Sequence, residues 1–238
     1  MLSKKVIKDI QSLVHKKLRD ESGLFVAEGR KIVDELIKTE ETRIETIYAT
    51  PDWVVDYPDL PNVQVVTKAE LQRISFLSTP NKVLALVKYF PVQVPNTKTL
   101  VLYLDEIQDP GNLGTIIRIA DWFGINNVVC SEQCADHYNP KVVQATMGSI
   151  ARVRVYSDYE LQWLKKQQPV YVSTIDGTTI SEFGKVNEGV LVIGNESRGI
   201  REEILDLANA TVSIPRIGGA ESLNAAIATG ILLSHMLT

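Results

Sequence analysis

Two polar loops late in the chain contain the residue types best suited to holding a small ligand. The first, residues 194–199, directly follows the apolar run 190–193. The second, residues 215–224, follows a shorter apolar run and contains two adjacent glycines. Glycine allows a backbone to turn tightly and to approach a ligand closely. Because large side chains are scarce in both loops, we expect backbone amides and carbonyls to make much of the contact.

A third candidate is the stretch 112–118, which begins with Asn112 and ends with Arg118. It comes after the continuous apolar run 100–104, which is typical of a strand buried in a parallel sheet. We predict a helix over 113–123 with Asn112 as its N-cap. From this helix Arg118 could reach back towards the strand ends, and an ordinary surface ion pair is the alternative.

Comparison with known fingerprints excludes several nucleotide and hydrolase chemistries. Gly194 and Gly199 have the spacing of a phosphate-binding loop, but Ile200 and Arg201 stand where that loop needs Lys and Ser or Thr. The chain contains no Gly-x-Gly, so the dinucleotide fingerprint is absent, and it contains no Gly-x-Ser-x-Gly nucleophile elbow. A cofactor site built from glycine and asparagine loops remains.

The cysteines predict no metal site. Cys130, Cys134 and His137 form a Cys-x3-Cys-x2-His cluster. Structural zinc needs four ligands, and the nearest other candidates, Glu132 and Asp136, are hard oxygen donors. We therefore interpret the two cysteines as reduced thiols and expect no disulfide framework.

The composition indicates a soluble globular protein. Of the 238 residues, 45% are hydrophobic and 23% are charged, which is ordinary for a folded domain. We find no signal-peptide core and no apolar run of membrane-spanning length, so we expect a cytoplasmic protein without membrane contact. The net charge is −4, yet residues 1–31 contain eight Lys or Arg and four acids. This basic region could recruit a polyanion or could be a solvated helix face, and charge alone does not separate the two.

Alternating strand and helix patterns predict an α/β protein with two domains. We assign residues 1–92 to a small α/β domain, 93–98 to a proline-flanked linker and 99–238 to a larger domain with a parallel sheet. If the strands predicted at 190–193 and 211–214 are neighbours in that sheet, both polar loops lie on one rim.

Helical spacing predicts four further helices. The last of them is apolar nearly all round, as burial on both sides requires. These helices are predicted over residues 3–20, 139–147, 159–166 and 222–237.

Three sequence blocks together resemble the SpoU (TrmH-like) family of RNA ribose 2'-O-methyltransferases, in the SPOUT superfamily. The resemblance covers about residues 100–237, and the order and spacing of the blocks make it specific. The segment 16–30 is similar to the RNA-binding domain that many members carry. The blocks are 112–118 with Gly124 after it, 193–199, and 214–216 followed by Ser222, Leu223, Asn224 and 225–228.

The resemblance implies a fold and a cofactor that the residue patterns alone do not reveal. The fold would be a parallel α/β sheet with a deep trefoil knot, a feature nearly absent from other proteins. The cofactor would be S-adenosylmethionine, held largely by backbone, and the family forms homodimers through the knotted domain. The implied cofactor-binding residues are Thr174, Gly194, Asn195, Glu196, Gly199, Ile214, Leu223 and Asn224.

The resemblance also implies residues for methyl transfer to a ribose 2'-hydroxyl. Arg118 would stabilise the developing alkoxide and anchor the adjacent phosphate, because a guanidinium stays protonated below about pH 12. Asn112 would cap its helix and orient Arg118, while Glu196 would fix its own loop and pair with Arg118. Ser222 and Asn224 would hold ribose or phosphate, and a purely loop-shaping role for Glu196 and Ser222 is the alternative. The implied RNA-binding residues are Lys16, Lys17, Arg19, Arg30 and Arg118.

Other functions stay open. A catalytically inactive RNA-binding protein would keep the fold, but the presence of the implied catalytic residues argues against it. A related enzyme could methylate a base, or a ribose of transfer RNA. The extra amino-terminal domain favours ribosomal RNA. Arg216, residues 219–221 and Gln144 depart from the usual family pattern, which questions RNA contacts near the site more than cofactor binding.

Overall fold

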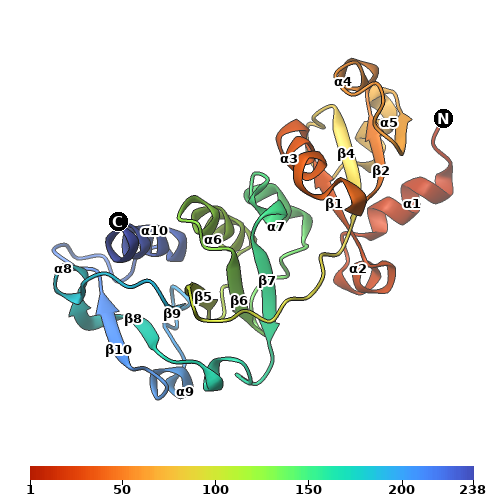
Figure 1. Cartoon of the computed structure of the whole chain (residues 1–238). Coiled ribbons are helices and arrows are strands. Elements are labelled where there is room, and N and C mark those ends of the chain that lie inside the picture. Colours follow the sequence, from red (N-terminus) through yellow and green to blue (C-terminus); the bar gives the residue numbers. More distant parts are fainter. The chain divides into compact units, whose positions relative to one another are not determined.

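The computed structural model describes all 238 residues, and the chain divides into two compact units (Figure 1). The amino-terminal unit comprises Met1–Pro91 together with Tyr138–Ala151. The second unit comprises Val92–His137 and Arg152–Thr238. No helix has both the length and the apolar character needed to cross a membrane.

The segment Tyr138–Ala151 lies within the predicted extent of the second domain but packs with the amino-terminal unit. Tyr138 stacks on Phe25 and Tyr89, with ring centroids 4.7 and 4.1 Å apart. Its hydroxyl accepts a hydrogen bond from the Phe90 amide at 2.9 Å. Aromatic pairs of this kind stabilise a core beyond the area they bury, so this segment completes a core to which it is not adjacent in sequence.

The amino-terminal unit is built on a four-stranded mixed sheet in the order β1-β4-β2-β3. Helices cover both faces of this sheet. The strands are β1 (Leu24–Glu28), β2 (Ile44–Ala49), β3 (Val63–Val65) and β4 (Val83–Lys88). The helices are α1 (Lys4–Ser12), α2 (Lys16–Ser22), α3 (Arg30–Glu40), α4 (Pro51–Val54), α5 (Lys68–Ile74) and α7 (Pro140–Ala145), with a short 3-10 helix at Glu41–Arg43.

The single helix predicted over 3–20 is two helices, α1 and α2, and Arg19 holds the turn between them. The Arg19 side chain is buried, with 1% of the residue exposed. One of its terminal nitrogens, Nη1, donates to the backbone carbonyls of Leu13 at 2.7 Å and Val14 at 2.9 Å. These carbonyls lie where α1 stops, and a buried carbonyl needs a donor. The prediction that Arg19 binds RNA is therefore wrong, because its guanidinium is used inside the fold.

The second unit is built on a six-stranded sheet in the order β10-β8-β9-β5-β6-β7, in which every pairing is parallel. The central strands β5 and β9 are buried along their whole length, as expected for strands covered on both faces. The strands are β5 (Leu100–Leu104), β6 (Asn127–Ser131), β7 (Arg154–Asp158), β8 (Val170–Thr179), β9 (Gly189–Ile193) and β10 (Ala210–Ser213).

The two strands that precede the polar loops, β9 and β10, are not neighbours, so the arrangement considered for the sequence is not the one formed. Strand β8 pairs with β10 on one side and with β9 on the other. Because all three strands are parallel, their carboxyl ends still meet at one edge of the sheet. The end of β8 therefore joins the two polar loops at this edge.

The helices of the second unit lie on both faces of its sheet (Figure 1). Helix α6 (Pro110–Trp122) packs against α10 (Ala225–Leu237). On the opposite face, Ile204 of α9 (Glu202–Leu205) shares a core with Val101 and Tyr103 of β5. Two predicted helices are shorter than expected: α10 begins at Ala225 and not at 222, and only Leu164–Lys166 is helical within 159–166, as a 3-10 turn. The remaining helix, α8, spans Ile180–Phe183.

Candidate active site

Helix α6 begins three residues earlier than predicted, and this changes the position of Asn112. Asp109 is the N-cap, and its Oδ1 accepts a hydrogen bond from the Asn112 amide at 2.8 Å. Pro110 occupies the first helical position, where its missing N–H costs nothing. Asn112 is therefore not the cap. Its side chain lies in the first turn and is available for contacts outside the helix.

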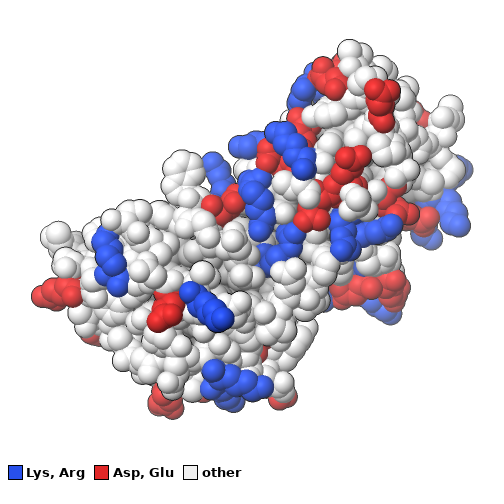
Figure 2. Space-filling view, viewed as in Figure 1, with Lys and Arg blue, Asp and Glu red and all other residues white.

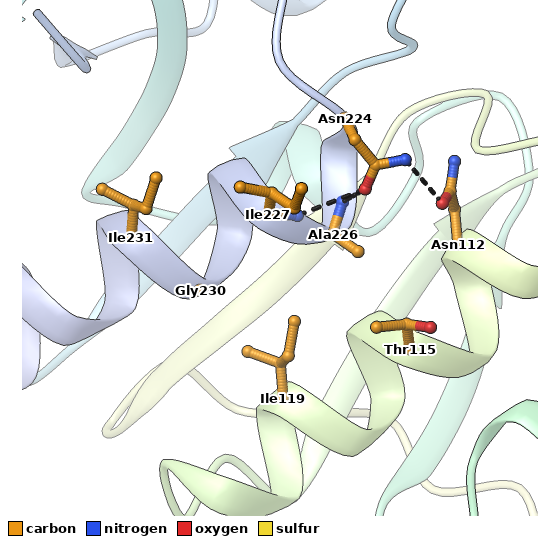
Figure 3. Close-up of a pocket in the computed structure, with 8 residues that line it drawn as sticks. All are labelled: Asn112, Thr115, Ile119, Asn224, Ala226, Ile227, Gly230 and Ile231. Atoms are coloured by element: carbon orange, nitrogen blue, oxygen red, sulfur yellow. Dashed lines mark hydrogen bonds between the residues drawn. The ribbon is translucent and has the colours of Figure 1, made fainter.

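Asn112, Glu196 and Asn224 form a hydrogen-bonded chain that joins three distant segments. The Asn112 amide Nδ2 donates to Glu196 Oε1. Asn224 Nδ2 donates to Asn112 Oδ1 at 2.8 Å (Figure 3). Glu196 Oε1 also accepts from the Ala225 amide at 3.3 Å. The expected pairing of Glu196 with Arg118 is not formed, because Glu196 is turned towards Asn112 and the start of α10.

Asn224 is the N-cap of α10. Its Oδ1 accepts hydrogen bonds from the amides of Ala226 at 3.1 Å and Ile227 at 3.3 Å (Figure 3). An asparagine at this position satisfies amides that would otherwise lack a partner. Since both ends of the Asn224 side chain are in use, it fixes the start of α10 against α6.

The loop 194–199 closes on itself. Asn195 and Gly199 form an isolated antiparallel bridge, with N–O distances of 3.1 and 2.9 Å. Asn195 Oδ1 accepts from the amides of Ser197 and Arg198. A Cβ added to Gly194 would lie 2.4 Å from Ile200 Cγ1 and 2.7 Å from the Gly199 carbonyl oxygen. Only glycine fits at position 194 without a shift of the loop.

A buried ion pair that the sequence reading missed anchors this loop to the end of β5. Asp105 is completely buried, and its Oδ1 lies 2.8 Å from Arg201 Nε and 2.7 Å from Nη2. Its other oxygen accepts from the Arg201 amide at 3.1 Å. A second link follows, since Glu106 binds Arg198 at 3.1 Å through its carboxylate and Asn195 Nδ2 at 2.9 Å through its carbonyl. An acid placed directly after a fully buried strand is the sequence signal that could have revealed this pair, because a buried charge needs a partner.

A cavity of about 880 Å³ lies where the two polar loops meet residues 173–176 of β8. Its walls include apolar side chains such as Ile193, Val212 and Leu232. Most of the predicted cofactor-binding residues line it, and so does Ser222, whereas Asn224 does not. The predicted residues that line it are Thr174, Gly194, Asn195, Glu196, Gly199, Ile214 and Leu223.

Arg118 lies on the exposed side of α6. It lines neither this cavity nor a smaller groove between α6 and α10, which is described below. It forms no hydrogen bond or ion pair. The structure therefore leaves its guanidinium available, but it does not bring Arg118 together with the cavity of its own chain.

A shallow groove of about 380 Å³ runs between α6 and α10 (Figure 3). Ile119 of α6 and Ile227 and Ile231 of α10 line it. Ile227 is 57% exposed, and Trp122, one turn beyond Ile119, is 85% exposed. Trp122 and Ile227 are therefore large apolar side chains left in contact with solvent.

Apart from the buried Arg19, the predicted RNA-binding residues of α2 and α3 are exposed but paired with acids. Lys16 lies 2.7 Å from Asp20, and Lys17 lies 4.0 Å from Glu21. Figure 2 shows blue and red side chains mixed over this unit. Arg30 lies 2.7 Å from Asp56 and 3.3 Å from Asp34, and the hydrogen bond that Arg30 donates to Asp56 raises the pKa of Arg30.

The cysteines lie apart from the cavity, at the end of β6. Cys130 is buried and Cys134 is partly buried, and both are free thiols. A hydrogen bond with Cys134 and burial raise the pKa of the Cys130 thiol, while the same hydrogen bond lowers the pKa of Cys134. No group of three or more His, Cys, Asp or Glu residues is placed to hold a metal ion.

Fold and site together define an α/β protein with a ligand cavity at the carboxyl ends of parallel strands, where open sheets bind their ligands. The model of the SpoU rRNA Methylase family matches residues 99–234, and that of the MRM3-like substrate binding domain matches residues 4–85. The chain belongs to the SpoU rRNA methylase family, which confirms the resemblance seen in the sequence blocks.

Similar proteins extend over nearly the whole chain. A TrmH-family structure from Porphyromonas gingivalis is 35% identical, covers 99% of this chain and 98% of its own, and superposes with a TM-score of 0.88. An AdoMet-bound rRNA methyltransferase from Sinorhizobium meliloti is 30% identical, with 99% and 95% coverage and a TM-score of 0.86. The 23S rRNA (guanosine(2553)-2'-O)-methyltransferase RlmP of Bacillus subtilis is 28% identical over 97% of this chain and 95% of its own length. The expected SPOUT-type α/β fold is confirmed by these matches.

Proposed function

We propose that this chain transfers a methyl group from S-adenosylmethionine to a ribose 2'-hydroxyl of ribosomal RNA, and that it works in the cytoplasm. The proposal depends on the cavity between the two polar loops. Asn112 of α6 hydrogen-bonds to Glu196 and to Asn224, and these bonds connect the cavity to α6. Membership of the SpoU rRNA methylase family and the full-length similarity to RlmP support the reaction and its RNA substrate.

The cavity fits S-adenosylmethionine in size and chemistry. A volume of about 880 Å³ is within the range of small-molecule sites. Apolar walls at Ile214 and Leu223 suit an adenine ring, and Gly194 and Gly199 expose backbone to the ligand. When bound, S-adenosylmethionine supplies an electrophilic methyl group on a sulfonium. The AdoMet-bound relative from Sinorhizobium meliloti supports this assignment.

The chain's own residues position the reaction. Glu196 and Asn112 hold the loop 194–199 against α6, so the cavity wall keeps its shape. Ser222 lines the cavity, and its hydroxyl is available to a ribose or phosphate. Such positioning supplies much of the rate of an in-line displacement.

Arg118 is the proposed electrostatic catalyst. An arginine side chain is a cation and not a base at neutral pH, so Arg118 stabilises a developing 2'-alkoxide and binds the adjacent phosphate, while the hydroxyl proton passes to water. Arg118 is exposed and forms no ion pair, which leaves its full charge for RNA.

A homodimer formed through a knotted carboxyl-terminal domain completes the proposal. The groove between α6 and α10 exposes Ile227, and Trp122 lies exposed beside it. A second copy covering this face would bury these side chains and bring its own α6, with Arg118, towards the cavity. This accounts for an arginine that lines no cavity in its own chain.

The test is Arg118→Ala in the full chain. We expect binding of S-adenosylmethionine, measured by calorimetry, to stay within about twofold of the wild type, since the role assigned to Arg118 is towards the RNA and not towards the cofactor. Methyl transfer to 23S rRNA should fall by about 100-fold or more, as for other removed electrostatic groups. Transfer at close to the wild-type rate would rule out the assigned role.

A second experiment tests the substrate. Mapping of ribose methylation in RNA from cells that lack the gene should show one 2'-O-methyl group missing from ribosomal RNA. A missing group in transfer RNA, or a missing base methylation, would contradict the proposed substrate.

A further inference from the structure

Charge is divided unequally between the two helix layers of the amino-terminal unit. Helices α1 and α5 together contain five Lys or Arg and two acids, a net charge of +3. On the other face, α3, α4, α7 and the 3-10 helix Glu41–Arg43 contain five Lys or Arg and five acids, a net charge of 0. In a chain with a net charge of −4, a positive layer of this kind is an electrostatic footprint for a polyanion.

The cations of the two layers also differ in their partners. Away from α1 and α5, six basic side chains of this unit form ion pairs with carboxylates, whereas Lys31, Arg43 and Lys141 form none. Examples are Arg30 with Asp34 and Asp56, Lys38 with Glu35, Lys82 with Asp52 and Lys88 with Glu45. The five cations of α1 and α5 are exposed and form no ion pair; they are Lys4, Lys5, Lys8, Lys68 and Arg73.

Of the two acids on these helices, Asp9 and Glu70, the second is already committed to the fold. Glu70 accepts hydrogen bonds from the amides of Leu2 at 2.7 Å and Thr67 at 3.0 Å. It closes the capping box of α5, and these amides lower the pKa of Glu70 to about 2. Glu70 therefore holds the start of α5 and forms no ion pair with any of the five cations.

Helices α1 and α5 present these cations as one surface. The two helices pack together, and Gln11 Nε2 of α1 donates to the Arg73 carbonyl at 2.7 Å. Their apolar sides, including Ile7 and Leu71, share one core cluster, so their polar sides face outward together. Blue side chains lie over α1 in Figure 2.

We infer that the outer face of α1 and α5 is the surface by which the amino-terminal unit binds RNA phosphates. This inference rests on the proposed RNA substrate and replaces the paired residues of α2 and α3 as the contact region. A paired lysine must give up its carboxylate before it binds a phosphate, whereas an unpaired one exchanges only counterions. Contacts of this kind fix the position of the RNA and do not read its sequence.

The test compares two triple variants with equal loss of charge. Lys4→Gln/Lys5→Gln/Lys8→Gln removes three unpaired cations, and Lys38→Gln/Lys82→Gln/Lys88→Gln removes three paired ones. Gln keeps a helix propensity close to that of Lys. Binding of in vitro transcribed 23S rRNA is measured by filter binding over a salt series of roughly 50 to 200 mM.

The unpaired-lysine variant should bind the RNA about tenfold or more weakly, with a salt slope lower by about one for each lysine that contacts a phosphate. The paired-lysine variant should stay within about twofold of the wild type, with an unchanged slope. Equal loss in both variants, or no loss in the first, would overturn the inference.

A second variant and a second readout separate this surface from folding and from the chemistry. Lys68→Gln/Arg73→Gln tests the same face on α5 in case changes in α1 disturb folding, which melting temperature reports. Calorimetry with S-adenosylmethionine should show unchanged affinity in every variant. Lysine-dependent RNA binding without any methyl transfer by the wild type would contradict the proposed activity and leave the surface in place.

Discussion

The two loops that form the cavity are held in opposite ways. The loop 194–201 is fixed by its internal Asn195–Gly199 bridge, by Glu106 and by the buried Asp105–Arg201 pair. Residues 215–223 make no hydrogen bond, and Ile217 is fully exposed. Regions with few buried contacts and few hydrogen bonds have low local stability. We infer that the first loop sets the shape of the site and that the second loop adapts to the bound ligand.

The largest effect should come from the most crowded position of the fixed loop. In Gly194→Ala, the new Cβ would overlap Ile200 and the Gly199 carbonyl, so the loop must move. A misplacement of about 1 Å lowers rate about 100-fold, and we expect at least this loss of methyl transfer. Binding of S-adenosylmethionine by calorimetry should weaken in parallel. Retained affinity and activity would show that the loop does not set the site.

The anchor of the fixed loop should give the next largest effect. Asp105→Asn removes the charge that faces Arg201 while keeping the shape of the side chain. Removing one partner of a buried ion pair costs about 3–5 kcal/mol, and we expect the lower end because Arg201 is 34% exposed. Melting temperature should fall and cofactor affinity should weaken. Asp121→Asn, which breaks the Arg152–Asp121 pair on the outer side of α6, is the control and should leave cofactor affinity unchanged.

Glu196→Ala should have a smaller effect. It leaves the Asn112 side chain and the Ala225 amide without their acceptor. Each such loss costs about 1–3 kcal/mol, less where water can enter, so we expect a drop in activity of roughly tenfold. The matched change in the other loop is Glu221→Ala, which removes an exposed side chain without a hydrogen-bond partner. Similar losses in both variants would contradict the distinction between the loops.

These comparisons also show what the sequence could and could not predict. The two loops and Arg118 were identified because glycine, asparagine and arginine at fixed spacings follow strands whose apolar runs are unmistakable. The order of the strands could not be predicted. Strand β8 lies between β9 and β10, and the crossover that places it there leaves no local pattern in the sequence. The sequence offers two good caps for α6, Asp109 and Asn112, and Pro110 at the first helical position decides for Asp109.

Burial of charge was the other feature that the sequence did not reveal. In the sequence Arg19 looks like its exposed neighbours Lys16 and Lys17. Its side chain is nevertheless buried, because it donates to backbone carbonyls between α1 and α2 that have no partner within a helix. Asp105 and Arg201 are 96 positions apart, so their pairing depends on the sheet being assembled. In the same way, Tyr138 joins a core built from residues far earlier in the chain.

The smallest effect is expected in the unanchored loop. In Gly218→Ala, the added Cβ meets no atom within 4 Å, and the backbone needs no special conformation. Such a change at an open surface position stays within about 0.5 kcal/mol. Cofactor affinity and methyl transfer should therefore equal the wild type. A loss comparable to that of Gly194→Ala would mean that this loop is as tightly fixed as the first when the site is in use.

A structure of the full chain with S-adenosylmethionine tests the central claim most directly. We expect the cofactor to lie between residues 194–199 and 214–223, in contact with backbone groups of both loops. We also expect the guanidinium of Arg118 from a second copy to lie near the methyl group of the cofactor. Cofactor bound outside this cavity, or every Arg118 turned away from it, would contradict the account.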